Sequence, residues 1–568
     1  MVSVLTDSGH HSERGHREST DILLSACMMV KDEEAMLPGC LESIRDHVDE
    51  LVIVDTGSTD RTVEIAQAFG ARLFHHPWEQ NFSLHRNQSI AYARGRWIFI
   101  IDADEVLAPA SVRSLRDEIA LADTKGIDSM VMKVENMMSR GRETVCNDSI
   151  RLFLNNGAIR YEGIVHNNLT GFSQPGGSLN RIIHYGYDKG RGMAEKKFQR
   201  TAALLRRQIA ENPASAAAHM YLSSSYASLD LFEESLKEGM IAVDLAESQN
   251  ITNKTYVRAY YDVIRALILS KRYEEARRYC AKAFDRFGDQ IDVLAARTMI
   301  AFEEKEWASV LDYGTRYLEH LNRYRTGAGA SEMVHVATYG DAWKIYGWMG
   351  SAHLKRGTID EAERLFRGAL DCAADRVAVF RHAGLALISA GRIDSALPYL
   401  EQAYALAGGT EDSRVVEALF KIGILKKDRM RAARMRTVAL AMADLSLSWC
   451  MELADFAARY GDAESALALC TAVSEMDEEH IGARLRASLL LLAEGRIEEV
   501  VRHCDEMLRI LSLPRDVTIA SFADLAALFA GIGNNLRGKN IPGDAIAHRI
   551  SAQLNDIERH ASRPSGAP

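Results

Sequence analysis

The sequence of 568 residues lacks features that would place the chain in a membrane. No stretch approaches the roughly 20 consecutive apolar residues that span a bilayer. Residues 1–20 are polar and contain no apolar signal-peptide segment. We therefore expect a cytoplasmic protein without membrane insertion.

Excess positive charge and closely spaced cysteines are also missing. Lysine plus arginine number 68 against 78 for aspartate plus glutamate, a formal net charge of −10. This balance predicts no general attraction to nucleic acid or anionic lipid, so an anionic ligand must be held locally. The 8 cysteines lie far apart and include no C-x-x-C pair, which argues against a small disulfide scaffold and favours buried, reduced thiols.

The composition is that of a folded protein with more than one unit. The chain is 47% hydrophobic and 26% charged, which is typical of globular proteins. Single hydrophobic cores stop growing at roughly 250–300 residues. The pattern of apolar residues changes near residue 190, and we expect a disordered tail over 1–20, an α/β domain over 21–190, an all-α domain over 191–557 and a second disordered tail over 558–568.

The N-terminal domain has the pattern of a layered α/β fold. Its short apolar runs predict strands at Leu23–Val30, Leu51–Val54, Arg72–Phe74 and Trp97–Ile101. Runs such as LVIV and WIFII do not alternate with polar residues, which is typical of strands buried on both faces of a mostly parallel sheet. Ligands of such sheets bind beyond the carboxyl ends of the strands.

Beyond residue 190 the chain has an internal repeat. Ala362 and Ala396 lie 34 residues apart in aligned segments, and so do Gly350 and Gly384. A period of 34 residues is that of tetratricopeptide helical hairpins. We therefore expect hairpins that stack into a superhelix with an extended concave surface, because one hairpin cannot bury its apolar face alone.

The repeat is interrupted once in the middle of the helical region. Val310 and Ala362 occupy equivalent positions but lie 52 residues apart, and a loop around Gly327–Glu332 falls between them. We interpret this loop as an insertion in the array.

The segment WIFIIDADE carries the clearest chemical signal. A buried strand ends at Ile101 and is followed by Asp102 and Asp104, which extended backbone directs to the same side. Two such carboxylates can bind a hard divalent cation that offsets the charge of a diphosphate. Carboxylates after a strand are also common as solvated turn residues, so this pair alone leaves both interpretations open.

Neighbouring motifs favour the first interpretation. Asp55 closes the second strand, and Asp60 lies where it could cap the following helix. With KDEE at 31–34, VDTGSTDRT at 54–62 and HRNQSIAYARGRWIFIIDADE at 85–105, residues 21–110 resemble the front half of glycosyltransferase family 2. The resemblance implies a GT-A fold over the N-terminal domain.

The resemblance also implies a donor site. A nucleotide sugar, with UDP the expected nucleotide, would be bound by Val30, Lys31, Asp32, Asp55, Arg86, Asp102, Ala103 and Asp104. Mn²⁺ or Mg²⁺ would be held by Asp102 and Asp104, and His184 in IIHYGY would complete the metal shell. The alternatives are a turn carboxylate for Asp55, a surface cation for Arg86 and a structural histidine for His184.

The segment from Ser149 to Leu169 resembles the acceptor side of bacterial family 2 members with tetratricopeptide repeats, the sublancin-type peptide S-glycosyltransferases among them. Relatives commonly have His-Glu where this chain has His166 and Asn167. An asparagine cannot take a proton from an acceptor. Glu162 and His166 are therefore the candidate bases. A thiol acceptor that ionises readily would depend less on such a base.

These observations favour a metal-dependent, inverting glycosyltransferase that acts on a peptide or protein recruited by the repeats. One alternative is transfer to a glycan or secondary metabolite. Another is a catalytically weak, nucleotide-binding scaffold, and a repeat-only adaptor would leave the acidic motifs unexplained. A second copy of the chain is a further candidate partner for the repeats.

Overall fold

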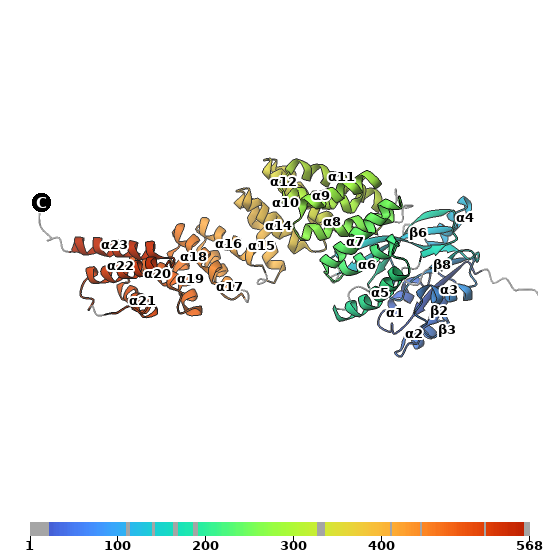
Figure 1. The fold of residues 1–568 in the computed structure, drawn as a ribbon, viewed down its shortest axis with the longest axis horizontal. Helices are drawn as coiled ribbons and strands as arrows, with labels where there is room; N and C mark the ends of the chain where they lie inside the picture. Colours follow the sequence, from blue (N-terminus) through green and yellow to red (C-terminus); the bar gives the residue numbers. More distant parts are fainter. Residues whose placement is uncertain are drawn as a thin grey trace, which may run out of the picture. The chain divides into compact units, whose positions relative to one another are not determined.

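The computed structural model describes residues 22–109, 114–138, 143–162, 168–185, 191–326, 335–408, 412–442, 446–515 and 518–561. The chain divides into two compact units, Met1–Ala374 and Asp375–Pro568. The first unit contains the sheet and the first helices of the array, and the second is helical in its described residues (Figure 1).

One large sheet organises the N-terminal part of the first unit. Its strands, in the order in which they pair, are β3 (Arg72–His75), β2 (Glu50–Asp55), β1 (Leu24–Val30), β4 (Trp97–Ile100), β7 (Glu143–Leu154), β6 (Ser129–Met138), β10 (Pro175–His184) and β5 (Glu105–Leu107). β11 (His335–Val336) adds to β7, and β8 (Arg160–Glu162) pairs separately with β9 (Asn168–Thr170).

The sheet is parallel in its first half and mixed in its second. β3, β2, β1 and β4 are mutually parallel, which confirms the expected α/β layering, and each begins within one residue of its predicted start. β7 runs antiparallel to both β4 and β6. β6 ends at Met138 and β7 begins at Glu143, a separation too short for the crossover that parallel strands require, so the two strands pair antiparallel.

Both faces of the parallel half are buried, as the unalternating apolar runs predict. On one face Phe99 packs in a core with α1 (Leu37–Ile44) and α4 (Leu115–Lys125). On the other face Ile98 and Ile100 pack near Ile90 of α3 (Phe82–Tyr92). The helix α2 (Thr62–Ala68) follows β2, and the carboxylate of Asp60 accepts a hydrogen bond from Thr62 N (3.0 Å) at its start.

The rest of the first unit is built from antiparallel helix pairs. Its helices are α5 (Arg191–Glu211), α6 (Ala216–Ala227), α7 (Phe232–Ser248), α8 (Val257–Leu269), α9 (Tyr273–Phe287), α10 (Ile291–Glu303), α11 (Trp307–Arg325), α12 (Ala342–Lys355) and α13 (Ile359–Cys372), with a 3₁₀ turn at Lys254–Tyr256.

The second unit continues the hairpins. Its helices are α14 (Arg376–Ser389), α15 (Ile393–Leu406), α16 (Ser413–Leu425), α17 (Arg429–Leu440), α18 (Leu447–Arg459), α19 (Ala463–Met476), α20 (Ile481–Ala493), α21 (Ile497–Ile510), α22 (Phe522–Gly538) and α23 (Asp544–Ala561). Consecutive hairpins confirm the predicted tetratricopeptide-like architecture.

Glycines at repeat spacing allow the paired helices to approach closely. A Cβ atom on Gly350 of α12 would lie 2.6 Å from the Phe366 ring of α13. A Cβ atom on Gly384 of α14 would lie 2.6 Å from Leu400 of α15. The same close contact thus recurs 34 residues later, once in each unit.

The insertion between α11 and α12 joins the helices to the sheet. Residues 327–334 of the predicted loop lie outside the described residues, but Val336 of β11 pairs with Cys146 of β7. Tyr324 Oη donates to Asp148 (2.7 Å), and Gly340 N donates to Thr144 O (2.9 Å). The additional residues therefore form a docking segment on β7.

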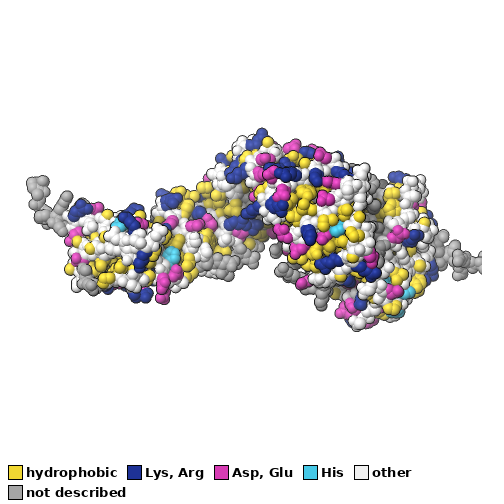
Figure 2. All heavy atoms as spheres, viewed as in Figure 1, with side chains coloured by type: hydrophobic (Ala, Val, Ile, Leu, Met, Phe, Trp, Pro, Cys, Tyr) yellow, Lys and Arg dark blue, Asp and Glu magenta, His cyan; other side chains and the backbone are white. Residues whose placement is uncertain are grey.

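Every cysteine is a free thiol, but Cys372 is exposed while the other seven are buried, so the prediction of burial is wrong at this last residue of α13. In the part of the chain that the structure describes, no helix has the length and apolarity needed to cross a bilayer. Figure 2 shows basic and acidic side chains interspersed over the visible face.

Candidate functional site

The KDEE and TGSTDR motifs hold each other in place beyond the ends of β1 and β2. Asp32 Oδ1 accepts a hydrogen bond from Thr59 N (2.7 Å), and Glu34 Oε2 accepts one from Arg61 N (3.1 Å). In the opposite direction, Glu34 N donates to Asp60 Oδ2 (3.0 Å). The acidic residues of these motifs therefore shape the loops at the carboxyl edge of the sheet.

Asp55 belongs to the same loop system. It is buried, and its carboxylate accepts hydrogen bonds from Gly57 N (3.2 Å) and Ser58 N (3.1 Å), with His75 Nδ1 3.3 Å away. Burial alone would raise the pKa of Asp55, but the hydrogen bonds from Ser58, His75 and Gly57 lower it below its usual value. Asp55 is thus ionised and held in a fixed orientation at the end of β2.

A cavity of about 560 Å³ opens at this edge of the sheet. Its size is in the range of small-molecule sites. Residues from the β1 loop, α3, the β4–β5 turn, β6, β7, β8, β10 and α5 line it: Met29, Val30, Lys31, Glu33, Phe82, Arg86, Asp102, Ala103, Asp104, Glu105, Val134, Asn136, Asn147, Ser149, Arg151, Tyr161, His184 and Arg200.

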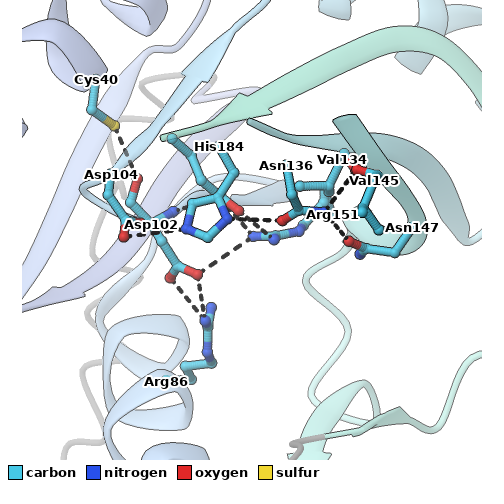
Figure 3. Close-up of polar contacts among 11 residues, drawn as sticks. Cys40, Arg86, Asp102, Asp104, Val134, Asn136, Val145, Asn147, Arg151 and His184 are labelled. Carbon is cyan, nitrogen blue, oxygen red and sulfur yellow. Dashed lines mark hydrogen bonds and ion pairs between the residues drawn. The ribbon is translucent and has the colours of Figure 1, made fainter. Parts of the chain in front are cut away.

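Asp102 is paired with arginines inside this cavity (Figure 3). Arg86 Nη2 donates to both Asp102 carboxylate oxygens (2.8 Å each), and Arg151 Nη1 lies 3.9 Å from Oδ2. Burial would raise the pKa of Asp102, but the charges of Arg86 and Arg151 lower it to about 2. Asp102 therefore carries its negative charge next to two cations.

Glu105 fixes the turn that presents these carboxylates. Its side chain accepts a hydrogen bond from Asp102 N (2.9 Å), and the Arg151 guanidinium donates to its two oxygens (2.9 and 2.7 Å). The glutamate and arginine are both buried. Such two-point pairs set geometry as well as charge, so Glu105 and Arg151 position the Asp102–Asp104 turn.

Asp104 has a separate partner. His184 Nε2 lies 3.2 Å from Asp104 Oδ2, and His184 Nδ1 lies 2.8 Å from Asn136 Oδ1. Asn136 Nδ2 in turn donates to Asn147 Oδ1 (2.7 Å), as Figure 3 shows. Two asparagines on neighbouring strands thereby orient the imidazole so that its second nitrogen faces Asp104.

The structure brings together much of the predicted donor site. Val30, Lys31, Arg86, Asp102, Ala103, Asp104 and His184 all line the cavity. Asp32 and Asp55 do not line it and are engaged in the loop contacts described above.

Neither predicted base is among the described residues of the cavity, and the predicted metal ligands do not all lie together. Glu162 is exposed, pairs with Arg160 (2.9 Å) and does not line the cavity, and His166 lies outside the described residues. Asp104 and His184 are adjacent, whereas Asp102 faces Arg86. Within the described ranges, no three or more His, Cys, Asp or Glu side chains form a group that could hold a metal ion.

Several cavity residues were not found from the sequence. Arg151 stands in the apolar run SIRLF, and Asn136 lies within β6. A charged residue within an otherwise apolar strand is a usable signal, because an arginine is rarely buried without a partner. Asn136, Tyr161 and Arg200 carry no comparable sequence signal.

Comparison with known families agrees with this geometry. Residues 25–181 match the family model described as Glycosyl transferase family 2. The matched segment contains β2 to β9 and most of β1 and β10. The first unit therefore contains a family 2 glycosyltransferase domain, and helical hairpins of the tetratricopeptide type follow it in the chain.

Individual relatives resemble only part of the chain. A TPR repeat-containing protein of Synechococcus elongatus is 36% identical over 225 residues, 38% of this chain and 54% of the relative. The SPbeta prophage-derived glycosyltransferase SunS of Bacillus subtilis is 25% identical over 206 residues, 35% of this chain and 48% of the relative. The chain thus spans about half the length of these curated relatives.

A solved structure titled as that of YrrB, a TPR protein with an unusual peptide-binding site, covers 38% of this chain and 98% of its own, with 18% identity and a TM-score of 0.29. The assignment of tetratricopeptide-type hairpins rests on the helix pairs and their spacing.

Proposed function

We propose that this protein is a glycosyltransferase that moves a sugar from a nucleotide-sugar donor, with UDP the expected nucleotide, to a peptide or protein acceptor. The observation that carries the proposal is the pair of carboxylates beyond β4, Asp102 and Asp104, which face one cavity with different partners. The family 2 match over residues 25–181 supports the reaction class.

Arg86 and Arg151 are assigned to the donor side of the reaction. Cleavage of the bond between sugar and diphosphate places negative charge on the leaving group, and preorganised cations stabilise such charge in a cavity that excludes bulk water. Asp102 holds the Arg86 guanidinium, and Glu105 holds that of Arg151. The two arginines are therefore fixed before substrate arrives.

The charges of the cavity are compatible with a divalent cation. Four formal positive charges balance four formal negative ones among the lining side chains: Lys31, Arg86, Arg151 and Arg200 against Glu33, Asp102, Asp104 and Glu105. A nucleotide sugar brings about two negative charges, which an ion such as Mn²⁺ or Mg²⁺ would offset.

Asp104 and His184 fit the role of holding this ion, with substrate oxygens supplying further ligands. The ion would supply electrostatic stabilisation of the diphosphate. The His184 ring is already oriented toward Asp104 by Asn136.

The acceptor and the stereochemistry belong to the same proposal. We assign a peptide or protein acceptor because the acceptor-side segment resembles that of peptide S-glycosyltransferases and because stacked hairpins offer extended surfaces for polypeptides. Transfer with inversion would need a base near the acceptor, for which Glu162 and His166 remain the candidates. A nucleotide-binding scaffold with weak catalysis is the second candidate, favoured by the exposed ion pair of Glu162 with Arg160.

Binding and transfer can be tested separately. The full-length protein is titrated calorimetrically with UDP, GDP and their sugar conjugates, with Mn²⁺ or with chelator. We expect one nucleotide to bind, and Asp104→Asn to weaken binding by about tenfold or more in the presence of Mn²⁺, since one charge-assisted contact contributes about 1.5–3 kcal/mol. The matched control is Asp46→Asn, which changes an exposed aspartate that lies 3.8 Å from Arg45.

Mass spectrometry of peptides incubated with donor then reports transfer. If the protein binds nucleotide but transfers sugar neither to an acceptor nor to water, the result would support the second candidate, a nucleotide-binding scaffold. Equal nucleotide affinity in wild type and Asp104→Asn would contradict the site.

A further inference from the structure

The cations that line the cavity differ in whether the protein already satisfies them. Arg86 is paired with Asp102, and Arg151 is paired with Glu105. Arg200, an exposed residue of α5, makes neither an ion pair nor a hydrogen bond with any residue that the structure describes. Toward the described residues the donors of its guanidinium are therefore unused, and a ligand in the cavity can accept from them.

An aromatic ring positions Arg200. Its guanidinium carbon lies 5.2 Å from the centroid of the Phe82 ring, and Trp78 packs edge-on against that ring with centroids 4.8 Å apart. Contact with an aromatic face holds an arginine side chain while the N–H groups at the rim of the guanidinium stay available. Arg200 is thus oriented by an aromatic ring, and no carboxylate of the described ranges holds it.

The same arrangement occurs one helical turn further along α3. Phe82 and Arg86 are four residues apart and lie on the same face of the helix. The Arg86 guanidinium lies 5.3 Å from the centroid of the Tyr161 ring. The wall of the cavity therefore contains the arginine–aromatic pairs of Arg86 and Arg200. Asp102 neutralises Arg86, whereas Arg200 has no carboxylate partner among the residues that the structure describes.

Arg200 comes from a different part of the chain than the rest of this wall. The segment that matches the family model contains Phe82, Arg86 and Tyr161 and ends at residue 181. The helix α5 begins after this segment, at Arg191. The first helix after the glycosyltransferase domain therefore contributes directly to the cavity, beyond any role of the helices in recruiting an acceptor.

We propose that Arg200 is a substrate-binding residue whose guanidinium binds an oxyanion of the substrate in this cavity. The inference rests on the proposed function and assigns to that site a residue from the helical array. The oxyanion is either the diphosphate of the donor or a carboxylate of the acceptor, and both offer the paired oxygen atoms that a guanidinium binds.

The test uses the full-length protein and the variants Arg200→Gln and Arg200→Lys. One arm measures binding of UDP, GDP, inorganic pyrophosphate and uridine by calorimetry with Mn²⁺. The other measures binding and glycosylation of fluorescent cysteine- and serine-containing hexapeptides that carry either glutamate or glutamine beside the acceptor residue.

Each source of the oxyanion predicts a different result. If it is the diphosphate, Arg200→Gln weakens binding of UDP or GDP and of pyrophosphate by about tenfold or more and leaves uridine unchanged. If it is the acceptor carboxylate, nucleotide binding is unchanged and the wild-type preference for the glutamate peptide disappears in Arg200→Gln. Arg200→Lys retains part of either effect, because it keeps the charge but not the planar fork.

The matched control is Arg206→Gln. Arg206 lies on the same helix and stands over an aromatic ring, that of Tyr226 at 5.9 Å, but it does not line the cavity. We expect wild-type behaviour from this variant.

Wild-type nucleotide binding and peptide preference in Arg200→Gln would overturn the inference while leaving the proposed function intact. Failure of the wild-type protein to bind any of these nucleotides would overturn the proposed function and this inference with it.

Discussion

A single nitrogen of Arg86 holds both oxygens of Asp102: Nη2 donates to Oδ1 and to Oδ2 over 2.8 Å. The Arg86 side chain is 15% exposed and that of Asp102 is 30% exposed, so the pair is only partly open to solvent. The first acidic residue of DADE is consequently tied to α3, and the second, Asp104, is the one that faces His184.

Removing the Arg86 charge is expected to destabilise the site. Arg86→Met keeps most of the side-chain stem but leaves Asp102 facing the more distant guanidinium of Arg151, 3.9 Å away. Breaking a buried ion pair costs about 3–5 kcal/mol, and partial exposure of this pair places the expected loss at the lower end. Urea unfolding and nucleotide titration measure the loss of stability and of donor affinity.

Arg45→Met, which breaks an exposed pair with Glu42, serves as the control and should change little. Similar losses in both variants would show that Asp102 does not depend on Arg86.

A double-mutant cycle tests whether Glu105 and Arg151 act as a unit. Arg151→Met leaves the buried Glu105 without its cation, and Glu105→Gln leaves Arg151 with only part of its compensation, from Asp102 3.9 Å away among the described residues, so each should lower the free energy of unfolding by up to about 3 kcal/mol. The double variant, Glu105→Gln with Arg151→Met, should lose no more than the worse single variant, because the second substitution removes the remaining charge. Additive losses measured by urea unfolding would mean that the two residues are not coupled.

Glycines of the hairpins provide a packing test within the second unit. A methyl group at Gly384 would lie 2.6 Å from Leu400, so Gly384→Ala should destabilise the unit by about 1–3 kcal/mol through overpacking. Gly531 of α22 has open space around its Cβ position, and Gly531→Ala should be neutral or stabilise by up to about 1 kcal/mol. Hydrogen exchange of the two hairpins measures both effects. Stabilisation by Gly384→Ala would contradict the packing described for this repeat.

Asp292 of α10 gives the stability of the first unit a dependence on pH. It is buried and accepts hydrogen bonds from Ala337 N (2.9 Å) and Thr338 N (2.8 Å), and burial raises its pKa to about 6 despite these hydrogen bonds. The folded state therefore binds the proton more tightly than the unfolded state, whose carboxyl has a pKa of about 3.9. The stabilisation that comes from the protonated Asp292 carboxyl is present below about pH 4 and is lost as the pH rises to about 6.

The comparison of wild type with Asp292→Asn isolates this contribution. Between pH 4 and 6 the difference in unfolding free energy should change by roughly 2–3 kcal/mol in the direction of lower wild-type stability at higher pH. Unfolding midpoints at several pH values measure it. A difference that does not vary with pH would show that Asp292 has an ordinary pKa in the folded protein.

Local patterns in the sequence determined much of this protein. The runs LVIV and WIFII specify strands buried on both sides, because an apolar run without alternation is stable only between two layers. The 34-residue spacing of Gly350 and Gly384 specifies helical hairpins, because each small residue removes the side chain that would keep two helices apart. The position of Asp102 and Asp104 directly after a buried strand predicted where the cavity lies.

Only the tertiary structure decided which partners these residues have. Arg86, Arg151 and His184 come from α3, β7 and β10, and their separate contacts with Asp102, Glu105 and Asp104 depend on how distant strands are ordered in the sheet. The sequence predicts a loop after α11, because two residues, His335 and Val336, are too few to give a strand signal. In the structure they pair with β7. Arg200 resembles any exposed helical arginine in sequence, and it becomes a cavity residue only because folding brings α5 against Phe82. Residue spacing fixes local conformation, whereas contacts between residues far apart in the chain require the whole fold.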